Sequence, residues 1–379
     1  MFWHLRREAA GRLEPVDYCG CMPNSLSLRR SAALILSGLC LVAGVVSISS
    51  DAQAQQSSNP SCTGLGYTVA TLDEVLIAFD LATGAATGTE VPTGSGPQDV
   101  GVTADGSAVI VAAYGDDLVD FYDAETLAPI DSTTVIAPIS IAVNPATGFI
   151  YVSQDGMNQI SILDPTSHAV SGTITTGGTV NAMTFTPDGS NLLAVETLSS
   201  AVEIFDQAGT QIGSPIALGV NPNAVVVTPD GTTAYVSATF QNEIIEIDLT
   251  TLVQTHHSVM NLPLGIAISP DGEYLWAPLL GSGQVQVFSL PTFTVETSIS
   301  VVGGPGIVMF APGIDLAYVT AQLASTLTGI SMDDRLVVST EAIAGGVFAM
   351  ALCPFAEPEP EPTTTTTVVV DPIAPTFTG

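Results

Sequence analysis

The chain has 379 residues, with 37 acidic residues against six Lys and Arg, and its formal net charge at pH 7 is −31. Nucleic-acid binding depends on basic side chains that neutralise phosphates, so this composition argues against nucleic acids and anionic membranes as partners. Five of the six basic residues precede residue 31, which leaves Arg335 in the rest of the chain. Cations, neutral glycans and basic proteins stay open as partners, and the alternative is that acidity only keeps the protein in solution.

Residues 1–54 are predicted to be an export signal with an upstream extension. Arg29 and Arg30 precede an apolar run, and Ala-Gln-Ala at 52–54 supplies the small residues of a cleavage site. We therefore expect a protein that is secreted or displayed on a cell surface, with the periplasm as the alternative, and a short linker at 55–61.

The C-terminal residues 356–379 have the composition of a tail. Alternating Glu and Pro are followed by five threonines, a pattern typical of a stiff, extended and O-glycosylated spacer. A disordered Pro/Glu/Thr-rich terminus is the alternative interpretation.

Between these ends the sequence repeats itself about every 42 residues. One bulky residue recurs in register at spacings of 43, 41, 42, 42, 41 and 42, namely at Tyr67, Ile110, Tyr151, Leu193, Tyr235, Trp276 and Tyr318. A period in the forties, with short alternating strands, is typical of a β-propeller blade. The sequence predicts an all-β fold, a seven-bladed β-propeller over residues 62–355 with four antiparallel strands per blade.

Each repeat has the same internal order. A first apolar strand ends in a Pro-Asp-Gly turn, as at 187–189 and 229–231, and a second strand such as Tyr-Val-Ser at 151–153 follows. The third strand ends in an apolar residue and Asp in five repeats, at Asp80, Asp123, Asp164, Asp206 and Asp248. We interpret these aspartates as turn residues that bind backbone N–H groups, and a ring of functional carboxylates is the alternative.

The repeat resembles the YVTN family of seven-bladed propellers, in which the unit runs apolar-Pro-Asp-Gly, Tyr-Val, then Val-x-apolar-Asp. Surface-layer and cell-surface repeat proteins belong to this family, and similar propellers occur in quinoprotein amine dehydrogenases and lactonases. The resemblance implies the architecture strongly and an activity only weakly.

Two cysteines after residue 54 indicate how the ring closes. In register, Cys353 stands just before the position of the turn proline, and Cys62 stands where Asp230 stands in its repeat. The last strand of the chain therefore joins three strands from its beginning in one blade. A Cys62–Cys353 disulfide is predicted in place of the missing turn, and two free thiols are the alternative.

The usual catalytic motifs are not found. There is no Cys-x-x-Cys-His, His-Glu-x-x-His or Gly-x-Ser-x-Gly, and no Lys for a phosphate-binding loop. His168 lies beside a turn, and His256 and His257 are adjacent in a predicted outer strand, where neighbours point to opposite faces and cannot share a metal. A lactonase of this fold would be expected to use basic and histidine groups around the central channel. Arg335 is expected near the outside of its blade, which argues against a lactonase activity. No catalytic or cofactor-binding residue is assigned.

The loops between second and third strands carry acids and amides on one rim of the predicted ring. Oxygen ligands of this kind suit Ca²⁺, and they also suit sugar hydroxyls. The candidate calcium ligands are Asp73, Glu74, Asp116, Asp117, Asp155, Asn158, Glu196, Asn242 and Glu243. No loop has the dense Asp spacing of a dedicated calcium motif, so a solvated surface is the alternative.

The sequence thus favours a monomeric, non-enzymatic recognition scaffold that binds a protein or a neutral glycan, with a cation-dependent mode as one version. The alternative is an enzyme with its site at the mouth of the channel, of the lactonase-like hydrolase or amine-dehydrogenase-like type. Paired carboxylates can act as general acid and base, but their separation is not readable from sequence.

Overall fold

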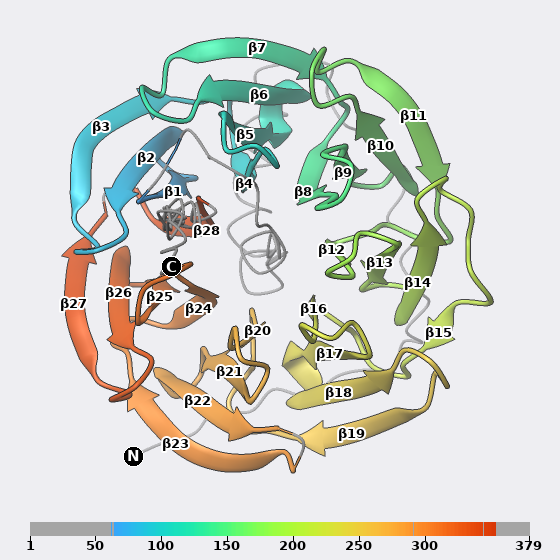
Figure 1. Ribbon diagram of the computed structural model, residues 1–379, viewed down its shortest axis with the longest axis vertical. Coiled ribbons are helices and arrows are strands. Elements are labelled where there is room, and N and C mark those ends of the chain that lie inside the picture. The colour runs from blue at the N-terminus through green and yellow to red at the C-terminus, as the bar shows by residue number, and fades with distance from the viewer. Residues whose placement is uncertain (1–61, 63, 291, 344, 354–379) are drawn as a thin grey trace, which may run out of the picture. The chain divides into compact units, whose positions relative to one another are not determined.

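The computed structural model describes residues 62, 64–290, 292–343 and 345–353. The predicted leader, linker and tail lie outside these residues. Within them, strands β1 to β28 form seven four-stranded antiparallel sheets arranged in a ring (Figure 1). The predicted seven-bladed β-propeller is confirmed. In this part of the chain, no helix has the length and hydropathy needed to cross a membrane.

The blades are numbered here from the one that contains both ends of the ring, and their strands run from the inside outward. Blade 1 contains β28 (Val347–Leu352), β1 (Leu65–Ala70), β2 (Val75–Asp80) and β3 (Ala86–Pro92). Blade 2 contains β4 (Pro97–Val102), β5 (Ala108–Ala113), β6 (Leu118–Asp123) and β7 (Pro129–Thr134). Blade 3 contains β8 (Pro138–Val143), β9 (Ile150–Gln154), β10 (Gln159–Leu163) and β11 (Val170–Thr175).

The other four blades repeat this order. Blade 4 contains β12 (Ala182–Phe185), β13 (Asn191–Glu196), β14 (Ala201–Asp206) and β15 (Ile216–Ala217). Blade 5 contains β16 (Ala224–Val227), β17 (Thr233–Ala238), β18 (Glu243–Asp248) and β19 (Gln254–Ser258). Blade 6 contains β20 (Ala267–Ile268), β21 (Tyr274–Leu279), β22 (Gln284–Ser289) and β23 (Thr294–Ser300). Blade 7 contains β24 (Pro305–Phe310), β25 (Leu316–Ala321), β26 (Thr326–Ser331) and β27 (Val337–Ala342).

Burial falls from the inside of each blade to the outside. Every residue of the inner strands β8, β24 and β28 is buried, whereas most residues of the outer strands β3 and β7 are exposed. An inner strand is covered on both faces by neighbouring blades, which is why it tolerates continuous apolar sequence. The outer strands face solvent and are rich in Thr, Ser and acids.

The bulky residues that recur in the sequence pack between neighbouring blades. Six of the seven occupy the third position of their blade's second strand, and all are at most 3% exposed. The Tyr67 hydroxyl donates to the carbonyl of Ala124 in blade 2 at 2.6 Å, and the Tyr318 hydroxyl of blade 7 donates to Leu81 at 2.8 Å. Burial raises the pKa of Tyr318 to about 12. One large side chain per blade thus fixes the distance to the next blade.

The ring closes in blade 1, where the end of the chain meets its beginning. Strand β28 pairs antiparallel with β1, so that Ala351 lies opposite Tyr67. A disulfide joins Cys62 to Cys353 over a sequence separation of 291 residues. The predicted closure and the predicted disulfide are confirmed.

The Pro-Asp-Gly turns are held by the aspartate side chain. In blade 4, Asp188 Oδ1 accepts hydrogen bonds from Thr186 Oγ1 at 2.6 Å and from the N–H of Ser190 at 3.0 Å. Gly189 has a φ of +68°, which an L side chain adopts rarely. These hydrogen bonds, with that from Thr186 the largest, lower the pKa of Asp188. The turns therefore follow from the sequence motif, as predicted.

Candidate functional site

The face of the ring that the sequence marks as a candidate site is made of loops and links. Because neighbouring strands are antiparallel, the loops between second and third strands lie on the same face as the links between blades. Hydrogen bonds join them directly, from Gly115 N to Ser95 O at 2.8 Å and from Asp155 N to Ala137 O at 2.8 Å. This surface is called the loop face below, and it includes the loops at 71–74, 114–117, 155–158, 197–200, 239–242, 280–283 and 322–325.

The last residue of each of these loops has the same backbone conformation. All seven have φ between +48° and +66°, and they are Glu74, Asp117, Asn158, Ser200, Asn242, Gly283 and Ser325. The carbonyl of each accepts a hydrogen bond from the next link, for example from Val135 N to Asp117 O at 3.0 Å. Asn, Asp and Gly tolerate this left-handed conformation best. Four of the predicted calcium ligands therefore occupy a position with a structural reason for a short polar residue.

Side chains of the predicted ligands also bind the links. Glu74 Oε1 accepts hydrogen bonds from Ser95 Oγ at 2.7 Å and from Gly96 N at 3.3 Å, and Asp116 Oδ2 accepts one from Ser95 N at 2.8 Å. Glu74 and Asp116, from adjacent blades, are thus brought together around Ser95. Asp117 Oδ1 accepts a hydrogen bond from the next link, at Ala137 N, over 2.8 Å.

The other predicted ligands are spread around the ring. Asp155 Oδ2 accepts a hydrogen bond from the Tyr114 hydroxyl at 3.2 Å, and Asn242 Oδ1 accepts one from Leu262 N at 2.8 Å. Glu243 Oε2 lies 2.8 Å from Nδ1 of His256 on β19. Asp73 is exposed beside Gly345. Across the described residues, no group of three His, Cys, Asp or Glu side chains gathers closely enough to hold a metal ion. Calcium binding here stays a prediction.

Glu196 differs from these residues because it is buried beside a second carboxyl group. Glu196 and Glu203 are 2% and 3% exposed, on β13 and β14. Glu196 Oε1 accepts a hydrogen bond from Gly178 N at 2.7 Å, and Glu203 Oε2 accepts one from Gly177 N at 3.1 Å. Burial raises the pKa of Glu203, and the charge of Glu196 acts in the same direction. Glu203 was not among the predicted site residues, and its signal in the sequence is a carboxylate inside an otherwise apolar strand.

Two more buried carboxylates were missed for the same reason. Asp120, on β6, accepts hydrogen bonds from Gly94 N at 3.2 Å and Ser132 Oγ at 2.7 Å. Asp99, on the inner strand β4, is fully buried and accepts one from Ile141 N of β8 at 2.7 Å. These acids connect neighbouring blades.

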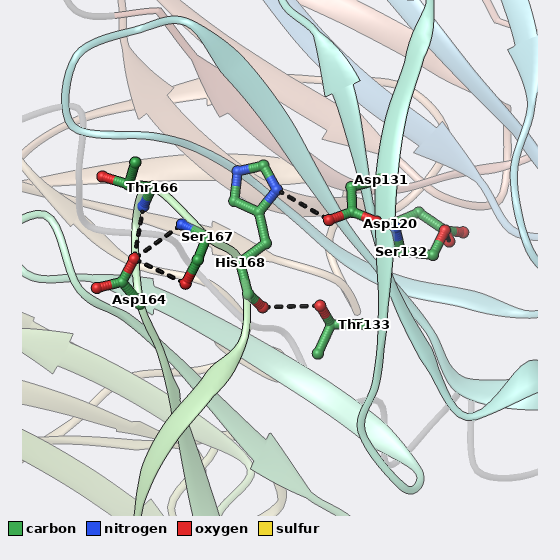
Figure 2. A network of polar contacts seen from close by, with 8 residues as sticks. All are labelled: Asp120, Asp131, Ser132, Thr133, Asp164, Thr166, Ser167 and His168. Atoms are coloured by element: carbon green, nitrogen blue, oxygen red, sulfur yellow. Dashed lines mark hydrogen bonds and ion pairs between the residues drawn. The ribbon is translucent and has the colours of Figure 1, made fainter.

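The aspartates at the ends of third strands are turn residues, as predicted. Figure 2 shows Asp164 accepting hydrogen bonds from the N–H groups of Thr166 and Ser167, at 3.0 and 2.8 Å. His168 follows in the same turn, where it stacks on the Phe121 ring of blade 2 at 3.8 Å and lies 3.6 Å from Asp131. This histidine serves as a contact between blades 2 and 3.

The two adjacent histidines of β19 have different partners on opposite faces of the sheet. His256 contacts Glu243, whereas Nε2 of His257 lies 2.9 Å from Glu246 Oε2. The His257 ring also stacks on Phe293 at 3.7 Å. The prediction that this pair cannot share one metal agrees with these contacts.

The loop face also exposes apolar side chains, which the sequence analysis did not single out. The five most exposed large apolar residues in the described part of the chain all lie on it, in loops or links. They are Leu72 (71%), Leu198 (83%), Met260 (74%), Val302 (85%) and Leu323 (80%).

Comparison with known proteins agrees with this fold. A family model described as YNCE-like beta-propeller matches residues 41–227, and no match was found among curated proteins. The described part of the chain thus has the β-propeller fold. The propeller is similar to a functionally unknown protein from Desulfotomaculum acetoxidans DSM 771, with a TM-score of 0.66 and 18% identity, covering 77% of this chain and 100% of that one.

Two further proteins of known structure are similar at the level of the fold. Kuenenia stuttgartiensis hydrazine synthase gives a TM-score of 0.61 at 18% identity, covering 72% of this chain and 94% of that one. The dihydro-heme d1 dehydrogenase NirN in complex with DHE gives 0.60 at 15% identity, covering 76% of this chain and 66% of that one. At such identities the likeness shows the fold alone.

Proposed function

We propose that this propeller is a non-enzymatic recognition scaffold, of the YVTN type, that is secreted or displayed on a cell surface and binds its partner through the loop face. The observation that carries the proposal is the concentration of the most exposed apolar side chains on that face. Exposed apolar surface that is concentrated on one face marks a site of interaction with other molecules. The inner strands, by contrast, are almost wholly buried.

The disulfide supports an oxidising compartment for the mature protein. Disulfides persist in secreted and surface proteins and are rare where thiols are kept reduced. Cys62 and Cys353 are both at most 1% exposed, so the bond lies inside the closing blade.

The buried acids lend no support to the alternative of an enzyme. Glu196 and Glu203 are neighbouring buried carboxyl groups, yet Glu196 accepts a hydrogen bond from Gly178 N, Glu203 accepts one from Gly177 N, and both are covered from solvent. A general acid or base must reach the proton that it transfers.

The scaffold function is tested by saturable binding of the labelled full chain to bacterial cells and to an array of neutral glycans. The decisive variant is Asp116→Asn with Asp117→Asn and Asp155→Asn, because Asn keeps a hydrogen-bond acceptor, for the links at 116 and 117 and for the Tyr114 hydroxyl at 155, and removes the charge. We expect weaker binding with unchanged unfolding. Absence of saturable binding by the wild-type protein, or equal binding by the variant, would contradict the proposal.

A cation-dependent mode is tested separately by thermal unfolding in EDTA and across titrations of Ca²⁺ and Mg²⁺. A ligand that binds only the native state raises its stability by about 2.7 kcal/mol at a hundred times its Kd. A saturable rise specific to Ca²⁺ would support a calcium site on the loop face. A rise equal for both cations would reduce the effect to ionic screening.

A further inference from the structure

Four of the five most exposed apolar side chains of the loop face lie in neighbouring parts of the ring, from the link after blade 5 to the first loop of blade 1, whereas Leu198 lies apart in blade 4. Leu280, in blade 6, and Leu323, in blade 7, both approach Gly304: a Cβ atom at that glycine would lie 2.9 Å from Leu280 Cδ1 and 3.0 Å from Leu323 Cδ1. The ends of both leucines therefore lie beside Gly304, whose φ of +72° favours glycine; Leu323 is exposed and Leu280 is partly buried against the core.

The same surface continues into the neighbouring blades. Leu323 N donates to Gly303 O at 2.9 Å, directly after Val302, and Leu72 N of blade 1 donates to Gly345 O at 3.1 Å. On the other side, Gly281 N donates to Asn261 O at 2.9 Å, directly after Met260. The name apolar arc is used here for Met260, Leu280, Val302, Leu323 and Leu72.

The apolar arc is free of charge in a strongly acidic protein. Residues 259–264, 280–284, 301–305 and 322–326 contain no Asp, Glu, Lys or Arg. Acidic residues begin where the arc ends, with Asp73 and Glu74 beside Leu72, and continue into blade 2 with Asp116 and Asp117. These four carboxylates are exposed. One face thus carries an uncharged apolar sector and, next to it, an acidic sector.

We propose that the apolar arc is the docking site for a segment of a partner protein that presents apolar side chains together with Lys or Arg. The inference rests on the proposed function and names the partner class. Exposed Leu, Val and Met side chains gain free energy from burial against other apolar groups, and they offer no hydrogen bonds to sugar hydroxyls. The adjoining acids select positive charge and speed its approach. The same acids repel an anionic membrane.

The arc can be altered without harm to the fold, which makes the inference testable. Val302 and Leu323 are 85% and 80% exposed, so replacing them removes little native packing. Exposed substitutions of this kind usually change the stability by less than about 0.5 kcal/mol. Val253 and Leu336, 63% and 62% exposed, lie in loops between third and fourth strands on the opposite face and serve as matched controls.

The experiment selects ligands for the full chain from a phage-displayed library of random peptides and then measures one synthetic, fluorescent selected peptide by anisotropy. We expect the selected peptides to combine Lys or Arg with Leu, Ile, Val or Phe. Val302→Ser with Leu323→Ser should weaken the peptide at least tenfold. Val253→Ser with Leu336→Ser should leave its Kd within a factor of two. Asp116→Asn with Asp117→Asn should weaken it less and flatten its salt dependence.

Each other outcome overturns the inference in a recognisable way. Selected peptides that lack basic or apolar residues, or binding that is equal in the arc variant and the control, would remove the arc as the docking site. Competition by a synthetic peptide of residues 356–379 would make the chain's own tail the occupant. Dimerisation in sedimentation that the arc variant abolishes would make it a second copy.

The scaffold function and the arc can fail separately. Cell binding that is lost in the triple Asn variant but kept in the arc variant would leave the scaffold in place and reject the arc. Peptide binding at the arc without any saturable binding to cells or glycans would reject a surface-recognition role and keep the arc.

Discussion

Glu203 Oε2 accepts a hydrogen bond from the backbone N–H of Gly177 at 3.1 Å, so that the third strand of blade 4 is fastened to the link that leaves blade 3. In blade 2, Asp120 accepts a hydrogen bond from the N–H of Gly94, in the link that leaves blade 1, at 3.2 Å. Both acids are the third residue of their strand. The propeller therefore uses buried carboxylates as acceptors for link N–H groups that the sheets leave unpaired.

Protonation of Glu203 should affect the stability of blade 4. Burial raises the pKa of Glu203, the Gly177 N–H partly offsets this rise, and the neighbouring Glu196 adds to it. Because the folded pKa lies above the unfolded value of about 4.3, protonation of Glu203 stabilises the fold. This stabilisation is complete below the unfolded value and is lost as the pH rises through the folded pKa. Glu203→Gln, which cannot lose a proton, should raise the free energy of unfolding at pH 7.

Urea unfolding at pH 4 and pH 7 checks this expectation. The gain should be present at pH 7 and nearly absent at pH 4, where the wild-type group is largely protonated. Glu296→Gln, on the exposed outer strand β23, is the control and should show no such difference. Equal destabilisation by Glu203→Gln at both pH values would show that the charge of Glu203 does not limit stability.

The turn aspartates should have the opposite effect on how the free energy of unfolding changes at acid pH. Hydrogen bonds from Thr186 and from Thr228 hold the pKa values of Asp188 and Asp230 below their usual range. Such groups stabilise the fold above the unfolded value of about 3.9, and that stabilisation disappears as the pH falls through the lower folded pKa.

Asp188→Asn with Asp230→Asn keeps an acceptor at each turn and removes the titration. We expect the variant to lose stability less steeply between pH 4 and pH 2 than the wild-type protein, as measured by circular dichroism in urea. Asp333→Asn with Asp334→Asn removes two exposed charges and should leave the slope unchanged. Parallel acid limbs in all three proteins would contradict the expectation.

The disulfide should stabilise the ring by restraining the unfolded chain. Closing a loop of 291 residues is worth about 5–6 kcal/mol in the chain-entropy model. Cys62→Ser with Cys353→Ser should lower the free energy of unfolding by several kcal/mol, toward that limit. Hydrogen exchange should show the earliest loss of protection in β28, because this strand joins blade 1 only through β1 within its sheet.

Reduction of the wild-type protein should reproduce the effect, and reduction of the double Ser variant should add nothing. A double variant as stable as the oxidised wild-type protein would mean that the closing hydrogen bonds between β28 and β1 suffice.

The fold was predictable because every blade packs against its neighbour in the same way. A bulky residue such as Tyr67 or Trp276 has to fill the same gap between blades, so it recurs at the same register. The placement of Cys62 and Cys353 in that register then identified the closing blade. Turn aspartates such as Asp164 were predictable as well, because their hydrogen bonds are local in sequence.

The candidate site was less predictable because its interactions join distant segments. The sequence marked Glu74 and Asp116 as acids on one rim, but it did not show that both bind the link at Ser95. Glu203 and Asp99 were missed because alternation treats a polar residue in a strand as outward-facing. The apolar arc was missed because Val302 and Met260 continue apolar runs in the sequence. Only the structure shows that each lies directly after the last buried residue of its run and is exposed.

Arg335 provides a last test of how blades are joined. Its guanidinium carbon lies 4.6 Å from the ring centroid of Tyr274 and 5.1 Å from that of Trp276, so a turn of blade 7 covers β21 of blade 6. A cation over aromatic rings contributes about 0.5–1 kcal/mol where it is partly exposed. Arg335→Gln should lower the free energy of unfolding by that amount and change the fluorescence emission of Trp276, the sole tryptophan after residue 3.

Arg335→Lys should keep part of the stabilisation. Arg335→Gln should lower the free energy of unfolding no further once Tyr274→Leu and Trp276→Leu have removed both rings. Equal costs in the two backgrounds would assign the contribution of Arg335 to the backbone of its turn, where its φ is +58°, and not to the rings.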